Sequence, residues 1–272
     1  MDARLQRRVQ RYGWDKAEAY YERYWARQLE PAQRRLLAMA DLQPGEYVLE
    51  TACGTGLLTL PAAAAVTSKG SVLATDISEK MVEATRLRAA ELGLQHIRVE
   101  RMDAEALTVD NSAFDAALCS LGLMYCPDPH QALKEMLRAL RPGGRAVSAV
   151  WGAREQCGWA EIFPIVDARV QSDVCPLFFQ LGQAENQAAV FTQAGFLQVR
   201  SERISTLLHY DSSEDAIGAA FVGGPVALAY SRIDDNEREK AHSEYLASIE
   251  PYRSGSTYEI PGEFVITSGK RG

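Results

Sequence analysis

The sequence predicts a doubly wound α/β fold with a mostly parallel, seven-stranded sheet. From about residue 45 onward, short apolar runs of strand length alternate with segments of helical periodicity, which is the pattern of a parallel sheet with crossover helices. Turn and cap residues separate these segments: Ser78 precedes one helical pattern, Gly93 follows it, and Pro142-Gly143-Gly144 stops the next. At 272 residues, the chain is long enough for one large α/β domain.

The elements follow from these patterns in chain order. Strands are predicted over residues 47–50, 71–75, 97–100, 114–120, 145–150, 196–203 and 264–268. Helices are predicted over residues 57–66, 78–92, 129–140 and 184–194. Asp128-Pro129 supplies a cap residue and a first helical residue for the third of these helices, and Gly195 ends the fourth.

Three regions are expected within a single domain. They are an N-terminal helical lid of several helices over 1–43, a ligand-binding core over 44–151, and the rest of the sheet over 152–272. Two segments of the last region, about 152–183 and 205–255, interrupt the strand-helix rhythm and are predicted to be helical insertions. We expect these insertions to form a cap over one edge of the sheet.

Composition excludes some classes of partner. Lys and Arg number 29 against 36 Asp and Glu, which gives a net charge of −7. Nucleic-acid binding needs clustered positive charge, so no nucleic-acid partner is expected. One basic run contains Arg7, Arg8 and Arg11, and it is predicted to be the solvated face of the first helix.

The apolar runs and the cysteines indicate the cellular compartment of the protein. No apolar run reaches the length of a membrane span, and residues 1–8 lack the apolar segment of a secretory signal. The five cysteines are scattered without a CxxC pair: Cys53, Cys119, Cys126, Cys157 and Cys175. We therefore expect a cytoplasmic protein with neither a disulfide framework nor a metal site.

Polar and glycine residues follow the first three predicted strands. Gly54 and Gly56 follow the first strand, where a tight turn would let the backbone approach a ligand closely. Asp76 ends the second strand and could accept both hydroxyls of a ribose. Asp103 follows the third strand, and its carboxylate could accept a hydrogen bond from an exocyclic amine. Ligands bind at the carboxyl ends of parallel strands, so these residues predict one shared site.

These motifs resemble those of the class I S-adenosylmethionine-dependent methyltransferases. The matching segments are Val48-Leu49-Glu50-Thr51-Ala52-Cys53-Gly54-Thr55-Gly56, Thr75-Asp76-Ile77-Ser78 with Met81, Asp103-Ala104, Phe114-Asp115-Ala116-Ala117 and Leu140-Arg141-Pro142-Gly143-Gly144. Within that family the sequence is most similar to the ubiquinone and menaquinone C-methyltransferase branch (methyltransferase type 11). The specific match covers residues 45–151 and implies a Rossmann-like fold.

The resemblance implies a cofactor and the residues that bind it. The cofactor would be S-adenosyl-L-methionine, and the product S-adenosyl-L-homocysteine. The implied binding residues are Glu50, Ala52, Gly54, Gly56, Asp76, Ile77, Met81, Met102, Asp103, Ala104, Ser120 and Leu121. The ribose would contact Asp76, the adenine Asp103, and the methionine part the two glycines. Glu50 departs from the aspartate that is usual in the family.

Other functions fit the motifs less well. A nicotinamide dehydrogenase needs a third glycine where this sequence has Thr59, and it leaves Asp103 unexplained. An RNA methyltransferase is disfavoured by the net charge. A non-catalytic regulatory or partner subunit that binds S-adenosylmethionine or S-adenosylhomocysteine stays open, because the motifs indicate cofactor binding and not turnover.

The methyl acceptor should be bound by residues outside the shared core. In the predicted lid, helical spacing gathers Ala17, Tyr20, Tyr21, Tyr24 and Trp25 on one aromatic face. We expect most of this face to pack on the domain or on a second subunit, so a homodimer is possible, and Tyr21 and Tyr24 to reach the ligands. This face favours a small, apolar or aromatic acceptor, methylated by in-line displacement at carbon, oxygen, nitrogen or sulfur.

Further acceptor-side candidates come from the strand ends and the insertions. Tyr125 follows the fourth strand and Trp151 ends the fifth. Tyr21 and His209 are the candidates for a catalytic group, although an isolated histidine is more often structural. Residues 216–229 are predicted to form two short helices joined at Gly223-Gly224-Pro225, either as a cover over the substrate or as a dimer contact.

Overall fold

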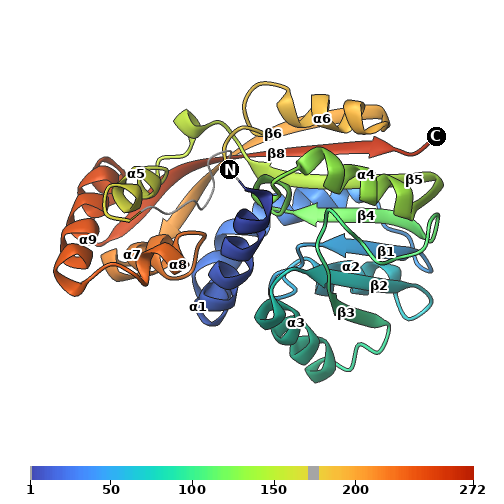
Figure 1. The fold of residues 1–272 in the computed structure, drawn as a ribbon, viewed down its shortest axis with the longest axis horizontal. Helices are drawn as coiled ribbons and strands as arrows, with labels where there is room; N and C mark the ends of the chain where they lie inside the picture. Colours follow the sequence, from blue (N-terminus) through green and yellow to red (C-terminus); the bar gives the residue numbers. More distant parts are fainter. Residues whose placement is uncertain (1, 171–177) are drawn as a thin grey trace.

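The computed structural model describes residues 2–170 and 178–272, and Cys175 lies outside this part. One sheet has the strand order β3-β2-β1-β4-β5-β8-β6, with the short β7 paired to β8 (Figure 1). The strands are β1 Tyr47–Thr51, β2 Ser71–Asp76, β3 Ile97–Arg101, β4 Phe114–Ser120, β5 Leu140–Trp151, β6 Leu197–Tyr210, β7 Arg253–Ser254 and β8 Thr257–Lys270. All seven predicted strands are present, and β7 is an additional strand of two residues.

The first five strands run parallel, whereas β8 is antiparallel to β5, β6 and β7. The sheet is therefore mostly parallel with an antiparallel edge, as a Rossmann-like fold of this kind requires. The central strands are almost fully buried, since β1 and β4 carry the apolar runs Val48-Leu49 and Ala116–Cys119 in the core. Strands covered on both faces read as continuous apolar runs, which made them recognisable in the sequence.

The described helices are α1 Ala3–Ala40, α2 Thr59–Val66, α3 Glu79–Glu91, α4 Pro129–Ala139, α5 Ile162–Asp167, α6 Asn186–Ala194, α7 Ser213–Phe221, α8 Ala227–Tyr230 and α9 Asp235–Ile249. The predicted caps are confirmed. Ser78 accepts a hydrogen bond from the Met81 N–H, and Asp128 accepts one from the Gln131 N–H. Gly195 ends α6 with a φ of 103°, which favours glycine.

The N-terminal region is one continuous helix of 38 residues, and the prediction of several helices was wrong. Pro31 lies inside α1 without ending it. The helix contacts α3 and β5 of the core as well as α7 and α8 (Figure 1). Burial of one side against the core and the other against α7 and α8 therefore outweighs the local helix-breaking tendency.

The late part of the chain supplies the cap. Strands β6 and β8 are longer than predicted, and their far ends carry α7, α8 and α9 away from the rest of the sheet (Figure 1). The buried side chains of the cap, which include Phe221, Tyr245 and Tyr258, belong to the same hydrophobic core as those of the sheet. The two short helices predicted over 216–229 are present as parts of α7 and α8. The three-region division of the chain stays a prediction.

Candidate functional site

A cavity lies where the carboxyl ends of β1 to β5 meet α1, and it encloses about 990 Å³ including its open mouth. Its lining residues are Arg7, Gln10, Trp14, Tyr21, Trp25, Leu29, Ala52, Gly54, Asp76, Ile77, Met81, Met102, Asp103, Ala104, Glu105, Ser120, Leu121, Gly122, Tyr125, Cys126, Pro127, Trp151, Trp159, Phe178, Gly224 and Pro225.

The sheet order spreads the predicted residues along this cavity. Asp103 follows β3, Asp76 ends β2, Gly54 follows β1, Ser120 ends β4 and Trp151 ends β5. Because neighbouring strands lie about 4.8 Å apart, β3 and β5 are separated by roughly 19 Å. The carboxylates therefore lie at one end of the cavity and the tryptophan at the other.

Ten of the twelve residues implied to bind the cofactor line this cavity, and Glu50 and Gly56 do not. Gly56 has a φ of 86°, and a Cβ there would lie 3.0 Å from the Thr85 side chain. Its glycine is therefore required by the turn and by the packing of α3 against it, not by direct approach to a ligand.

Two residues other than glycine adopt the left-handed conformation at the cavity wall. They are Ala52, with a φ of 55°, and Leu121, with a φ of 58°. Ala52 directly follows β1, and Leu121 directly follows β4. Such conformations cost about 1–3 kcal/mol each and cluster at functional sites. Two of them on adjacent strands, β1 and β4, indicate that the backbone here is shaped for a ligand.

Asp76 is buried and joins two segments of the site. Its Oδ2 accepts the Gly54 N–H at 2.9 Å, and its Oδ1 accepts the Ser78 N–H at 2.9 Å. Burial raises the pKa of this carboxyl to about 6, while the two backbone hydrogen bonds act in the opposite direction. Each oxygen keeps a lone pair, so the carboxylate can still accept hydroxyl donors from a ligand.

Asp103 is paired with a residue that the sequence analysis had placed in solvent. The Arg7 Nε lies 2.9 Å from Asp103 Oδ2, and the Arg7 guanidinium also binds Glu105. Glu105 is buried and accepts the Asp128 N–H at 2.9 Å. The expectation for Arg7 was wrong, because the start of α1 lies over the β3 end, where two carboxylates would otherwise share one site without a counter-charge.

Glu50 is buried beside the cavity, with its side chain directed at the start of α2. Its Oε2 accepts a hydrogen bond of 2.6 Å from the Thr59 hydroxyl. The pKa of Glu50 is raised to about 8, because burial outweighs the Thr59 hydrogen bond, which lowers it, and the negative charge of Asp76 adds to the rise. The longer side chain is thus accommodated by Thr59, the residue that replaces the third glycine of a dehydrogenase.

This raised pKa predicts a pH-dependent stability that Glu50→Gln removes. A carboxyl whose folded pKa exceeds its unfolded value stabilises the fold fully below the unfolded value, and that contribution is lost as the pH rises through about 8. Between pH 6.5 and 8.5 we expect the wild type to lose about 2 kcal/mol of unfolding free energy more than Glu50→Gln does. Urea denaturation at the two pH values measures the difference. If the wild type and Glu50→Gln lost the same unfolding free energy between these pH values, the pKa assigned to Glu50 would be contradicted.

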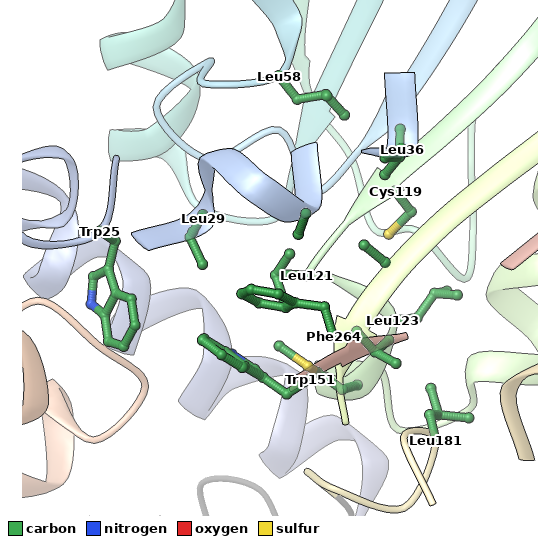
Figure 2. Close-up of a cluster of buried hydrophobic side chains, with 14 of the residues drawn as sticks. Trp25, Leu29, Leu36, Leu58, Cys119, Leu121, Leu123, Trp151, Leu181 and Phe264 are labelled. Carbon is green, nitrogen blue, oxygen red and sulfur yellow. The ribbon is translucent and has the colours of Figure 1, made fainter. Parts of the chain in front are cut away.

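The other end of the cavity is aromatic. Trp151 stacks on Phe264 with ring centroids 4.2 Å apart (Figure 2). The Trp159 ring lies 4.8 Å from that of Trp151. Trp25 of α1 completes the group, 6.0 Å from Trp151. Phe178 contacts Trp159 at 5.8 Å and lines the cavity as well. These rings form a wall suited to an apolar, flat ligand.

Of the remaining acceptor-side candidates, two line the cavity and one does not. Tyr21 and Tyr125 line the cavity, and both contact Trp14, at 5.6 and 5.1 Å between ring centroids. Burial and nearby Asp76 raise the pKa of Tyr21, so its phenol is neutral near pH 7. Tyr24 does not line the cavity, because it packs against α7 at Gly218, where its ring leaves no space for a Cβ.

Two further side chains that the sequence analysis considered do not line the cavity. His209 lies outside the cavity, half-exposed on β6, with Nδ1 3.6 Å from a Glu259 oxygen, and its backbone N–H donates to Gln28. This position fits the structural alternative, which is the more common one for an isolated histidine. Tyr20 is 47% exposed, because it lies on the side of α1 that faces solvent, whereas Trp25 reaches the cavity from the buried side.

Several cavity residues were missed by sequence reasoning. On α1 these are Arg7, Gln10, Trp14 and Leu29, and elsewhere they include Gly122, Trp159 and Phe178. The α1 residues did carry a signal, since positions 7, 14 and 21 are spaced by seven residues, which places them on one helix face. Trp159 and Phe178 belong to the insertion after β5 and carried none.

Two kinds of feature are absent from residues 2–170 and 178–272. No helix there is both long and apolar enough to cross a membrane. No group of three or more histidine, cysteine or acidic side chains there is arranged to hold a metal ion. The four cysteines in these ranges are free thiols.

The sheet order, the antiparallel strand next to the edge and the cavity at the strand ends define a Rossmann-like fold of the class I methyltransferase type. A family model described as "Methyltransferase domain" matches residues 48–144. The chain therefore carries a methyltransferase domain over residues 48–144 and is an S-adenosylmethionine-dependent methyltransferase.

Similar proteins agree with this assignment. Nocamycin O-methyltransferase from Saccharothrix syringae is 26% identical over 91% of this chain and 94% of its own length. A demethylmenaquinone methyltransferase from Staphylococcus epidermidis is 36% identical over 42% of this chain, and the match spans less than half of that enzyme, 47%. Phosphoethanolamine N-methyltransferase 2 from Haemonchus contortus, solved with S-adenosyl-L-methionine, shares the fold with a TM-score of 0.63 at 14% identity, over 95% of this chain and 57% of that one.

Proposed function

We propose that the chain transfers a methyl group to a small, flat and largely apolar acceptor bound at the aromatic end of the cavity. The observation that carries this proposal is the division of one cavity into a carboxylate end at β2 and β3 and an aromatic end at β5. The names of two relatives support it, since they refer to methyl transfer to nocamycin and demethylmenaquinone.

The carboxylate end fits an adenosyl group. Asp76 would accept the ribose hydroxyls, and Asp103, held by Arg7, would accept a hydrogen bond from the adenine amine. Met81 and Met102 line the same part of the cavity and could pack on the adenine ring. The Ser120 hydroxyl is buried at the end of β4 without a hydrogen-bond partner among the described residues, which suits a ligand with polar atoms at that point.

The chain's own contribution to the reaction would be alignment and exclusion of water. S-adenosylmethionine, when bound, supplies a methyl group on a sulfonium for in-line displacement. Holding two reactants in line can lower a barrier by about 7–11 kcal/mol. No carboxylate or histidine of the described residues lines the aromatic end. Tyr125, whose ring centroid lies 5.5 Å from that of Phe178, is a phenol in contact with that end.

Product formation tests the proposal. We expect S-adenosylhomocysteine to accumulate when the protein is incubated with S-adenosylmethionine and a panel of hydroxylated aromatic compounds, and to remain at background without them. The panel should also contain amines and a short RNA. Tight cofactor binding without turnover on any acceptor would favour a regulatory binding protein, and turnover only on RNA would exclude a small-molecule acceptor.

A further inference from the structure

Among the described residues that line the cavity, Arg7 is the only cationic side chain, and it lies at the carboxylate end. It comes from the first turns of α1, far in sequence from the strand ends that it meets. Its Nε lies 2.9 Å from Asp103 Oδ2, and its guanidinium also binds Glu105. The Arg7 and Asp103 side chains are 33% and 29% exposed, so a ligand in the cavity can reach this ion pair.

The Asp103 carboxylate is held in place by two different segments. Its Oδ1 accepts the Glu105 N–H at 2.9 Å, which fixes the carboxylate to its own turn. Its Oδ2 faces Arg7 in an ion pair, since the Arg7 Nε–H has no aligned hydrogen-bond acceptor among the described residues. The lone pairs of Oδ2 therefore stay open to a donor on a ligand, while the charge of Arg7 holds that oxygen in position.

The buried Glu105 side chain makes a cation necessary here. Its Oε1 accepts the Asp128 N–H at 2.9 Å, which anchors it to the start of α4. The pKa of Glu105 is raised by its burial, against the effects of the Asp128 N–H and of Arg7, and the charge of Asp103 adds to the rise. Because Glu105 is anchored, loss of Arg7 would leave Asp103 beside an uncompensated like charge. The repulsion would then push the Asp103 carboxylate out of its present position.

A carboxylate fixed at this point can distinguish purine bases. An ionised carboxylate only accepts hydrogen bonds, so it favours a base that presents an amine and repels one that presents an oxygen. Adenine carries an amine where hypoxanthine carries an oxo group. A carboxylate that is free to turn away would lose the attraction to the first base and avoid the repulsion from the second. Selectivity between the two bases therefore depends on what holds Asp103.

We propose that Arg7 is a positioning residue that makes the site selective for an adenine base, by fixing Asp103 as a hydrogen-bond acceptor. This inference rests on the placement of the adenine at Asp103 in the proposed function, and it adds the residue on which that recognition depends. Arg7 acts through Asp103 and contacts neither the methyl group nor the methyl acceptor. The first turns of α1 thus belong to the cofactor site, whereas Trp25 of the same helix belongs to the aromatic end.

The preference for S-adenosylhomocysteine over S-inosylhomocysteine tests this role without requiring turnover. The two ligands differ only in the base, where an oxo group replaces the amine, and calorimetry measures both affinities. We expect the wild type to prefer the adenosyl ligand by about 100-fold, because one base gains a hydrogen bond to a charged group and the other is repelled. Arg7→Met should reduce this preference to about tenfold or less, whereas Arg7→Lys, which keeps the charge, should retain most of it. If Arg7→Met does not fold, the neutral but polar Arg7→Gln gives the same comparison.

The matched control is Arg8→Met, because Arg8 is exposed at the next position of α1 and should leave both affinities unchanged. An Arg7→Met protein that loses both affinities by the same factor, with its preference intact, would show that Arg7 only stabilises the fold and would overturn the proposal. Equal affinities of the wild type for the two ligands would overturn it as well. Asp103→Asn should abolish the preference, since an amide both donates and accepts. A preference that survives Asp103→Asn would instead contradict the placement of the adenine.

Discussion

Asp76→Ala should weaken the binding of S-adenosylhomocysteine by roughly 10- to 150-fold, as hydrogen bonds to a charged group are worth about 1.5–3 kcal/mol. The substitution removes the proposed acceptor for the ribose hydroxyls. It also removes the acceptor of the Gly54 and Ser78 N–H groups, so the turn after β1 loses the hydrogen bond that joins it to the end of β2. Isothermal titration calorimetry with the purified variant measures the change.

Two comparisons separate a ribose contact from general damage. Asp76→Asn keeps one acceptor oxygen and should fall between the wild type and Asp76→Ala, whereas Asp235→Ala, at a 95% exposed side chain on α9, should bind as the wild type does. Since burial raises the pKa of Asp76 to about 6, wild-type affinity should decline below pH 6 as the carboxyl becomes protonated. An Asp76→Ala protein that binds as tightly as the wild type would show that the cofactor lies elsewhere.

Gly122→Ala should disrupt the site where the segment after β4 meets the turn after β1. A Cβ on Gly122 would overlap the Ala52 Cβ and would lie 2.8 Å from the Cys119 sulfur. Ala52 already has a strained φ of 55°, so the turn after β1 cannot move away without changing the wall of the cavity. We expect a loss of about 1–3 kcal/mol in unfolding free energy, the usual range for an overpacked site.

Cofactor affinity should fall in the same variant by at least about tenfold, because displacement of the turn after β1 would move Ala52 and Gly54, which line the cavity. Gly13→Ala is the matched control. Its Cβ would meet only ordinary contacts, 3.8 Å from Leu228 and 3.9 Å from Pro225, and alanine within α1 should stabilise the helix by up to about 1 kcal/mol. If Gly122→Ala bound S-adenosylhomocysteine normally, the close contact between β1 and β4 would have no part in shaping the site.

The cofactor end of the cavity was predictable because each strand end is a local feature. An apolar run of four to seven residues predicts a buried strand, and the first polar or glycine residue after it, such as Asp76 or Gly54, must lie at the carboxyl edge. The cap residues Ser78 and Asp128 were recognisable for the same reason, since their hydrogen bonds reach only three residues along the chain.

The acceptor end was less predictable because its residues come from segments that meet only in the folded chain. Helical spacing alone could not determine which side of α1 faces the sheet, so Tyr24 was expected at the ligands although Trp25 is there. Trp159 lies in an irregular insertion, and its position depends on packing against Trp151 and Phe178.

The sequence by itself determined the sheet, the order of its strand ends and the placement of the glycine turn, Asp76 and Asp103 along one edge, since periodicity, caps and turns act over a few residues. Tertiary structure alone decided that Arg7 pairs with Asp103 and Glu105 and that Glu50 turns away to Thr59. These outcomes depend on burial and charge compensation between distant segments, which no local pattern encodes.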